Sequence, residues 1–185
     1  MSNNEMSWVD DQEKKNEENR SNEYFNIVEG EQKFQILTPC ARLPQVWNNA
    51  EKKYRIAEEG DENISVKGLC FVLQDDQIKL AKLPYTVVKS LRALQNNEDW
   101  DFDFPFEHVL TLNAKNAGTK EVEYNLTASP KKTPFSQDIL DELAKKDPVD
   151  DIVEKMKEKQ QGEGSLEKAR REAKEEEAKA GNEAF

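Results

Sequence analysis

Histidine and cysteine, from which many catalytic and metal centres are built, are scarce in this sequence. Its 185 residues include one histidine, His108, and two cysteines, Cys40 and Cys70. A structural zinc site takes four such ligands, so we expect neither a metal site nor a cofactor. Carboxylate pairs occur without a nucleophile motif, a phosphate-binding loop or a metal triad, which predicts that the protein is not an enzyme. The two cysteines make no disulfide framework, and nothing in the sequence places them in contact.

Long apolar runs are also missing. No run approaches the roughly 20 residues that span a membrane, and the N-terminus is polar and acidic, unlike a signal peptide. We therefore expect a cytoplasmic, soluble protein that does not bind membranes.

Charge is abundant but unevenly placed. Charged residues make up 35% of the chain, the formal net charge is -11 and the mean hydropathy is -0.95. Residues 1–23 contribute -4 (3 basic, 7 acidic), residues 24–135 contribute -2 (14 and 16), and residues 136–185 contribute -5 (10 and 15). This division predicts an acidic flexible arm over 1–23, which is either disordered or loosely helical, a folded domain over 24–135, and a helical and disordered acidic tail over 136–185. Because the folded part is nearly neutral, the acidic total does not exclude nucleic-acid binding.

The stretch around which the chain is organised runs from residue 64 to residue 94. Residues 66–73 are rich in β-branched and aromatic side chains, which predicts a strand with apolar residues on both faces. Asp75 and Asp76 favour a turn, and residues 78–83 form the returning strand. Pro84 then marks the start of a short amphipathic helix.

The flanking segments add further short elements. The alternation in residues 32–37 predicts a long strand, whereas residues 38–44, with two prolines, are expected to be irregular. Residues 109–114 and 122–127 read as a hairpin, and residues 136–143 as a short capped helix. Strand, strand, strand, helix, hairpin is the order of a five-stranded OB-type barrel with one inserted helix. The predicted class is therefore mainly β, followed by the acidic tail.

Together these segments resemble the OB-fold single-stranded DNA-binding proteins of tailed phages, over roughly residues 24–150. The pieces that carry the resemblance are Phe25 to Leu37, the strand ending at Leu73, Ile78-Lys79-Leu80, Leu83-Pro84, Trp100-Asp101-Phe102, and Ala117 to Tyr124 before Pro130. The resemblance implies a protein that coats and protects single-stranded DNA during replication or recombination. It also implies a location in the host cytoplasm if a phage encodes the chain.

The C-terminus adds to the resemblance. Proteins of this family commonly end in an acidic tail with a terminal aromatic residue, which recruits replication proteins. Here Glu175-Glu176-Glu177 leads to a final Phe185, although Lys174 and Lys179 dilute the acidity. The resemblance thus implies that Phe185 binds a partner. The sequence leaves the oligomeric state open.

A protein that binds single strands without regard to sequence needs cations near phosphates and flat rings on which bases stack. Trp47 and the run Lys52-Lys53-Tyr54-Arg55 interleave these two residue types most closely. The full set of predicted ssDNA-binding residues on or near the first three strands is Lys33, Arg42, Trp47, Lys52, Lys53, Tyr54, Arg55, Lys67, Phe71, Lys79 and Lys82.

Some of these residues have a purely structural alternative. Phe71 fits a core position as well as a stacking position, and the Lys52–Arg55 run could be an ordinary solvated face. The aromatic residues between Trp100 and Phe106 are left out of the set, because Asp101 and Asp103 would repel phosphate.

A second function remains open at this stage. The near-neutral folded part also suits a protein–protein adaptor, in which the Glu/Lys-rich C-terminal helix is the interaction element.

Overall fold

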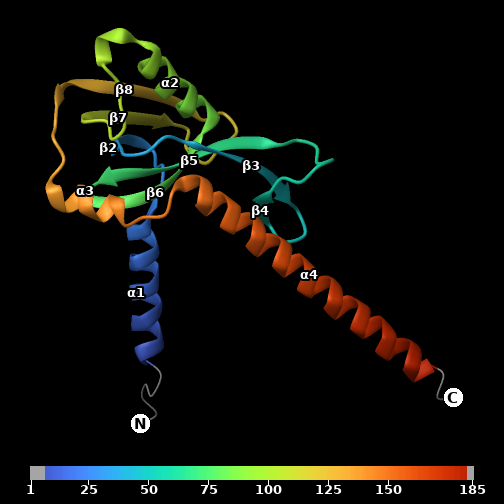
Figure 1. Ribbon diagram of the computed structural model, residues 1–185. Helices are drawn as coiled ribbons and strands as arrows, with labels where there is room; N and C mark the ends of the chain where they lie inside the picture. Colours follow the sequence, from blue (N-terminus) through green and yellow to red (C-terminus); the bar gives the residue numbers. More distant parts are fainter. Residues whose placement is uncertain (1–6, 183–185) are drawn as a thin grey trace. The chain divides into compact units, whose positions relative to one another are not determined.

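The structure is a computed structural model that describes residues 7–182 (Figure 1). Its elements in chain order are α1 (Ser7–Glu23), β1 (Tyr24–Phe25), β2 (Gly30–Ile36), β3 (Ala41–Asn48), β4 (Lys53–Ile56), β5 (Ser65–Gln74), β6 (Gln77–Pro84), α2 (Tyr85–Asn96), the 3-10 helix η1 (Glu98–Trp100), β7 (His108–Lys115), β8 (Glu123–Lys132), α3 (Gln137–Ala144) and α4 (Val149–Asn182).

The chain is mixed α/β, and one sheet of eight strands dominates it. The strand order is β1-β6-β5-β2-β7-β8, and β3 pairs with both β4 and β5. The β1–β6 pair is parallel, whereas β5–β6, β2–β7 and β7–β8 are antiparallel. The predominance of strands and the helical C-terminal region match the prediction. The sheet has eight strands instead of five, however, and it is not closed.

Two compact units divide the chain in a way that the sequence did not suggest. The sheet unit comprises the chain up to Leu43 together with Val66–Val149, and the hairpin unit comprises Pro44–Ser65 together with the chain from Asp150 onward. The folded region expected over 24–135 is thus interrupted by a segment that belongs with the C-terminal helix.

The β5–β6 hairpin follows the sequence prediction closely. Eight residue pairs join the strands, from Lys67 opposite Pro84 to Gln74 opposite Gln77. The two residues between the strands, Asp75 and Asp76, have φ angles of 52° and 59°. Two consecutive positive φ angles are typical of a type I′ turn, which suits the twist of a hairpin, and aspartate tolerates this conformation better than most residues.

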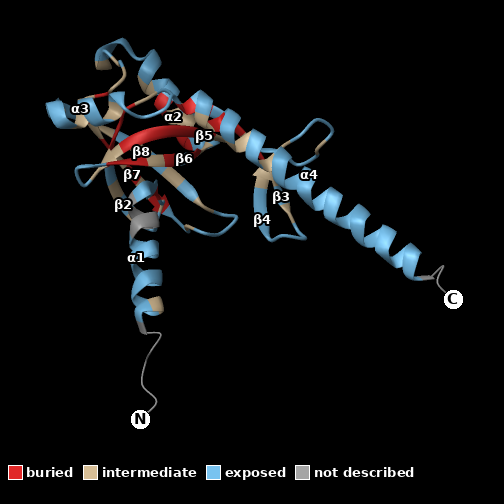
Figure 2. Ribbon diagram, turned by 60° about the horizontal axis from the view of Figure 1, so that its bottom comes forward, coloured by how far each residue is buried: buried red, intermediate tan, exposed pale blue. Residues whose placement is uncertain are grey.

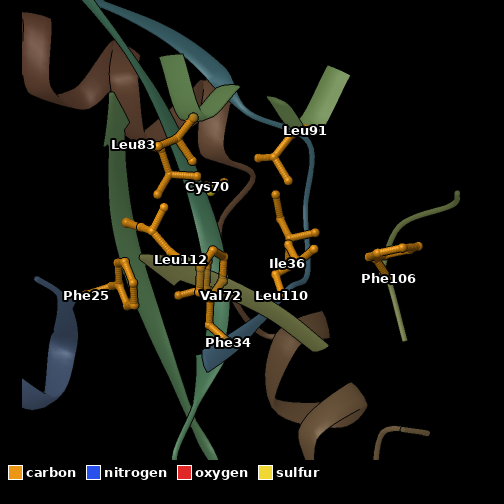
Figure 3. Close-up of a cluster of buried hydrophobic side chains, with 12 residues drawn as sticks. Phe25, Phe34, Ile36, Cys70, Val72, Leu83, Leu91, Phe106, Leu110 and Leu112 are labelled. Atoms are coloured by element: carbon orange, nitrogen blue, oxygen red, sulfur yellow. The ribbon is translucent and has the colours of Figure 1, made fainter. Parts of the chain in front are cut away.

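Side chains from β1, β2, β5, β6 and β7 pack together to form the core of the sheet unit (Figure 3). Phe25 packs on Phe34 with ring centroids 5.0 Å apart, and Val72 and Leu110 are fully buried beside them. The amphipathic helix α2 contributes Val87 and Leu91. Figure 2 shows burial concentrated in the sheet strands, whereas α1 and most of α4 are exposed.

One buried amide ties the ends of the β7–β8 hairpin to β2. The Gln35 side chain is 7% exposed, and its Nε2 donates to the Glu107 carbonyl at 2.8 Å and to the Thr133 carbonyl at 2.9 Å. A buried amide without partners would be costly, so these two bonds make the polar residue compatible with the core.

Gly68 allows helix α2 and Cys40 to lie unusually close to the backbone of β5. A Cβ placed on this glycine would lie 2.6 Å from Val88 Cγ2 of α2 and 3.0 Å from Cys40 Cβ. Cys40 also hydrogen-bonds Cys70, which lowers the pKa of Cys40 and raises the pKa of Cys70. The two thiols, which nothing in the sequence placed together, are therefore neighbours.

One further segment differs from the expectation. Residues 38–44 are irregular only up to Cys40, because β3 begins at Ala41 and includes Pro44. Proline lacks an N–H, but the Pro44 carbonyl still accepts a hydrogen bond from the Ala57 N–H at 2.9 Å. The arm, expected to be disordered or loosely helical, contains the helix α1, and residues 1–6 lie outside the described part of the chain.

We predict that Gly68→Ala destabilises the sheet unit by about 1–3 kcal/mol, because the added methyl group overlaps atoms of packed neighbours. Urea unfolding followed by circular dichroism measures the change. Gly162→Ala is the matched control: no atom lies within 4 Å of its added Cβ, and alanine should stabilise the interior of α4 by up to about 1 kcal/mol. A Gly68→Ala protein as stable as wild type would contradict the close packing.

Candidate nucleic-acid interface

The β3–β4 hairpin presents two exposed aromatic side chains as a pair. Trp47 is 46% exposed and Tyr54 is 49% exposed. They lie opposite each other in the register of the hairpin, with ring centroids 5.0 Å apart and an interplanar angle of 72°. Edge-to-face contact of this kind is favourable and fixes both rings. The rings therefore offer flat apolar surface to solvent at a defined place.

The tip of this hairpin carries two lysines. Asn48 Oδ1 accepts hydrogen bonds from the N–H groups of Ala50 and Glu51, at 3.0 and 3.3 Å, which shapes the turn. Lys52 follows with φ of 54°, and both Lys52 and Lys53 are exposed. Lys53 Nζ lies 3.2 Å from a Glu51 carboxylate oxygen. Exposed pairs of this kind are weak, so a phosphate can compete for the lysine.

Arg55, by contrast, has a structural role. Its Nη1 and Nη2 each lie 2.7 Å from a carboxylate oxygen of Asp61. These bonds, followed by one from the Glu58 N–H, lower the pKa of Asp61 to about 2. Asp61 therefore remains ionised at neutral and mildly acidic pH, and the bidentate pair persists. Arg55 holds the loop after β4, and we remove it from the candidate interface.

Two more predicted residues are inaccessible. Phe71 is 7% exposed and belongs to the packed part of the sheet. Lys79 is 9% exposed, and its Nζ lies 3.1 Å from Gln74 Oε1. Apolar residues on both faces of β5 suited either a central strand or a strand with one face kept for a ligand. Residues 68–72 are all buried, which agrees with the central strand.

The remaining candidates lie on the sheet unit. Lys33 is exposed on β2 and lines a cavity of about 230 Å³ together with Asp75 and Asp76, whose charges oppose phosphate binding there. Arg42 is exposed on β3. Lys67 is partly buried on β5, and Lys82 is exposed on β6. Burial lowers the pKa of Lys82, and the positive charge of Lys67 lowers it further. Phe185, the predicted partner-binding residue, lies outside the described residues.

The hairpin is anchored to α4 by one glutamine that the sequence gave no reason to single out. The Ile56 N–H donates to Gln160 Oε1 at 2.8 Å, and Gln160 Nε2 donates to the Ile56 carbonyl at 3.0 Å. The side-chain amide thus satisfies the outer edge of β4 as a neighbouring strand would. The two residues are 104 positions apart, so local sequence patterns carry no signal for this contact.

A groove of about 430 Å³ lies between the hairpin and α4 within the hairpin unit. Its charged lining residues are Glu51, Lys53, Arg55, Glu58, Lys159, Glu163 and Glu167. Four carboxylates against three cations make the groove a poor place for a nucleic-acid backbone. Lys53 and Tyr54 also line this groove, so a phosphate at the hairpin is favoured on their side away from α4, near Lys52 and Trp47.

The aromatic segment before β7 forms a separate packed feature. Phe102 and Phe106 stack with centroids 4.0 Å apart, and Trp100 meets His108 edge to face at 5.3 Å. His108 is buried, with Nδ1 2.7 Å from the Ser129 carbonyl oxygen. A cavity of about 440 Å³ beside these rings is lined by Asp101, Asp103 and Glu107 among others. Its acidic lining does not suit phosphate.

The chain matches no protein-family model, no curated protein and no solved structure. Within residues 7–182, no three histidine, cysteine or carboxylate side chains are grouped so that they could hold a metal ion. None of the helices described there is long and apolar enough to cross a membrane. The resemblance to phage DNA-binding proteins therefore stays a prediction.

We predict that Gln160→Ala frees the β3–β4 hairpin from α4, because the Ile56 N–H loses its side-chain acceptor and the Ile56 carbonyl loses one of its two side-chain donors, keeping the bond from Arg55 Nη1 at 3.3 Å. The loss should destabilise this contact by about 1–3 kcal/mol. Amide hydrogen exchange at Ile56 measures it and should become correspondingly faster. The control is Gln161→Ala, which removes an exposed neighbouring glutamine. Equal exchange rates in the two variants would show that the Gln160 amide does not hold the hairpin.

Proposed function

We propose that this protein binds single-stranded DNA without sequence preference and thereby coats and protects it during replication or recombination. The observation that carries the proposal is the exposed Trp47–Tyr54 pair beside Lys52 and Lys53 on one hairpin. Each stacked base contributes about 1–3 kcal/mol in proteins that bind in this way, and lysines at the edge of the rings attract the phosphates.

The preference for single strands follows from the same geometry. A base in a duplex is stacked on its neighbours and paired, so it cannot lie flat on Trp47 or Tyr54 without first being unpaired. An unpaired strand has no such cost. Binding should weaken as salt rises, because each neutralised phosphate releases counterions.

We also propose that the sheet is a variant of the OB layout. The succession β2, β5, β6, α2, β7, β8 supports this, since it follows the strand, strand, strand, helix, hairpin order of that fold. In this account β1 and the β3–β4 hairpin are additions. A host-cytoplasm location and recruitment of replication proteins through Phe185 belong to the same proposal and rest on the family resemblance.

The alternative function is a protein–protein adaptor. Its support is α4, in which residues 161–181 are exposed on every side, so that the helix has a long surface on which a partner could pack. The adaptor and the DNA-binding proposal differ in one simple outcome, which is whether the isolated chain binds oligo-dT at low salt.

We predict that Trp47→Ala weakens binding of fluorescently labelled oligo-dT by about 5- to 150-fold, the range that corresponds to one stacked base. Fluorescence anisotropy at low salt measures the affinity without relying on the protein's own tryptophans. Trp8→Ala is the matched control, because it removes a tryptophan that is 65% exposed on α1 and should leave the affinity unchanged.

Two results would count against the proposal. Equal affinity in the Trp47→Ala and Trp8→Ala proteins would exclude stacking on the hairpin. Failure of the wild-type protein to prefer oligo-dT over a duplex of equal length would leave the adaptor as the better account.

A further inference from the structure

Residues 77–97 differ in charge from the rest of the chain. They include no aspartate or glutamate, although 38 of the 185 residues are acidic, and they carry Lys79, Lys82, Lys89 and Arg92. β6 and α2 make up nearly all of this stretch. Lys79 is buried, whereas the other three cations are exposed. The sheet unit therefore has one segment of positive surface within an acidic protein.

An aromatic ring accompanies these cations on the outer side of α2. Tyr85, Lys89 and Arg92 are spaced by four and three residues, which places them on one stripe of the helix, opposite the buried Val87 and Leu91. Tyr85 is 58% exposed, and Lys89 Nζ lies 6.0 Å from the centroid of its ring. Arg92 Nη1 contacts only a neutral group, Gln95 Oε1, at 3.0 Å. The stripe thus joins a stacking surface to two cations.

Lys82 belongs to the other face of the β5–β6 hairpin. It lies opposite Leu69 in the hairpin register, whereas the neighbouring pair of Gly68 and Leu83 faces α2, since a Cβ on Gly68 would lie 2.6 Å from Val88 Cγ2. Successive side chains of a strand point to opposite faces, so Lys82 is not part of the α2 stripe. Within residues 7–182, no ion pair involves Lys89 or Arg92.

We infer that Lys89 and Arg92 bind the phosphates of a single-stranded nucleic acid and that Tyr85 stacks on one of its bases. We call these three residues the phosphate face. The inference rests on the proposed single-strand binding, to which it adds a second contact surface, on the sheet unit. No candidate predicted from the sequence lies on α2.

Charge and shape favour a nucleic-acid strand over other anionic surfaces. The α2 stripe extends about 10 Å from Tyr85 to Arg92 at 1.5 Å per residue, so its cations can contact successive phosphates. A membrane surface would be bound through apolar side chains that insert among the lipids. Tyr85 is the only large apolar side chain on this stripe.

The test compares two double variants of the full chain with the same change in charge. Lys89→Gln and Arg92→Gln together remove the charge of the phosphate face. The control removes one lysine and one arginine from exposed positions of α4, as Lys168→Gln and Arg170→Gln. For each protein, the affinity for labelled oligo-dT is measured by anisotropy at several salt concentrations.

Two lost phosphate contacts should lower the slope of log affinity against log salt by about 1.4, since each contact on a single strand contributes about 0.7. The α4 control should keep the wild-type slope. Tyr85→Ala, made separately, should weaken binding about fivefold or more while leaving the slope unchanged, because it removes stacking and no charge.

The outcomes separate this inference from the proposal on which it rests. If wild type binds oligo-dT through Trp47 but the phosphate-face variant keeps the wild-type slope, the phosphate face is excluded and the proposed function stands. If wild type does not bind oligo-dT at low salt, both are excluded. Equal loss of slope in the phosphate-face variant and the α4 control would assign the effect to net charge and overturn the inference.

Discussion

The central constraint in this structure is the burial of β5 on both of its faces. β5 pairs with β2, β3 and β6, and Leu69 and Cys70, which point to opposite sides of the strand, are both fully buried. Gly68 permits this arrangement, because a side chain there would collide with α2 and with Cys40. Through β3 the chain continues into the hairpin that presents Trp47, and through β6 it continues into α2. Both proposed contact surfaces are therefore connected along the chain to strands that pair with β5.

The distribution of charge explains how an acidic protein could bind a polyanion. The net charge of -11 is a sum over the whole sequence, whereas binding depends on the local field at the contact surface. The exposed basic groups of the two proposed contact surfaces lie at the tip of the β3–β4 hairpin and on α2. Carboxylates line the grooves instead, so phosphates are favoured on the exposed ridges and disfavoured in the cavities.

Local signals in the sequence predicted the elements that depend on local chemistry. The aspartate pair specified the β5–β6 turn, and the capped helix expected over residues 136–143 is α3, where Ser136 Oγ accepts a hydrogen bond from the Ile139 N–H. The β3–β4 hairpin was not predicted, because Pro44 and the polar residues around Trp47 do not show strand alternation. The anchoring of that hairpin by Gln160 depends on a contact across 104 residues, which no periodicity in the sequence encodes.

The candidate site was predictable to a similar extent. Interleaved aromatic and basic residues identified Trp47, Lys52, Lys53 and Tyr54, all of which are exposed on one hairpin. Residue type alone could not show that Arg55 would be held by a carboxylate or that Lys79 would be buried. The stripe on α2 was visible in the sequence, but the helix was interpreted only through its apolar side, so Tyr85 was missed.

The most direct test of the account is an NMR titration of the isotope-labelled full chain with oligo-dT at low salt. Binding through both surfaces predicts that the indole N–H signal of Trp47 and the amide signals of α2 shift with the same dissociation constant, while the indole signal of Trp8 stays in place. Shifts confined to the acidic cavity beside Phe106, or no shifts at all, would contradict the account.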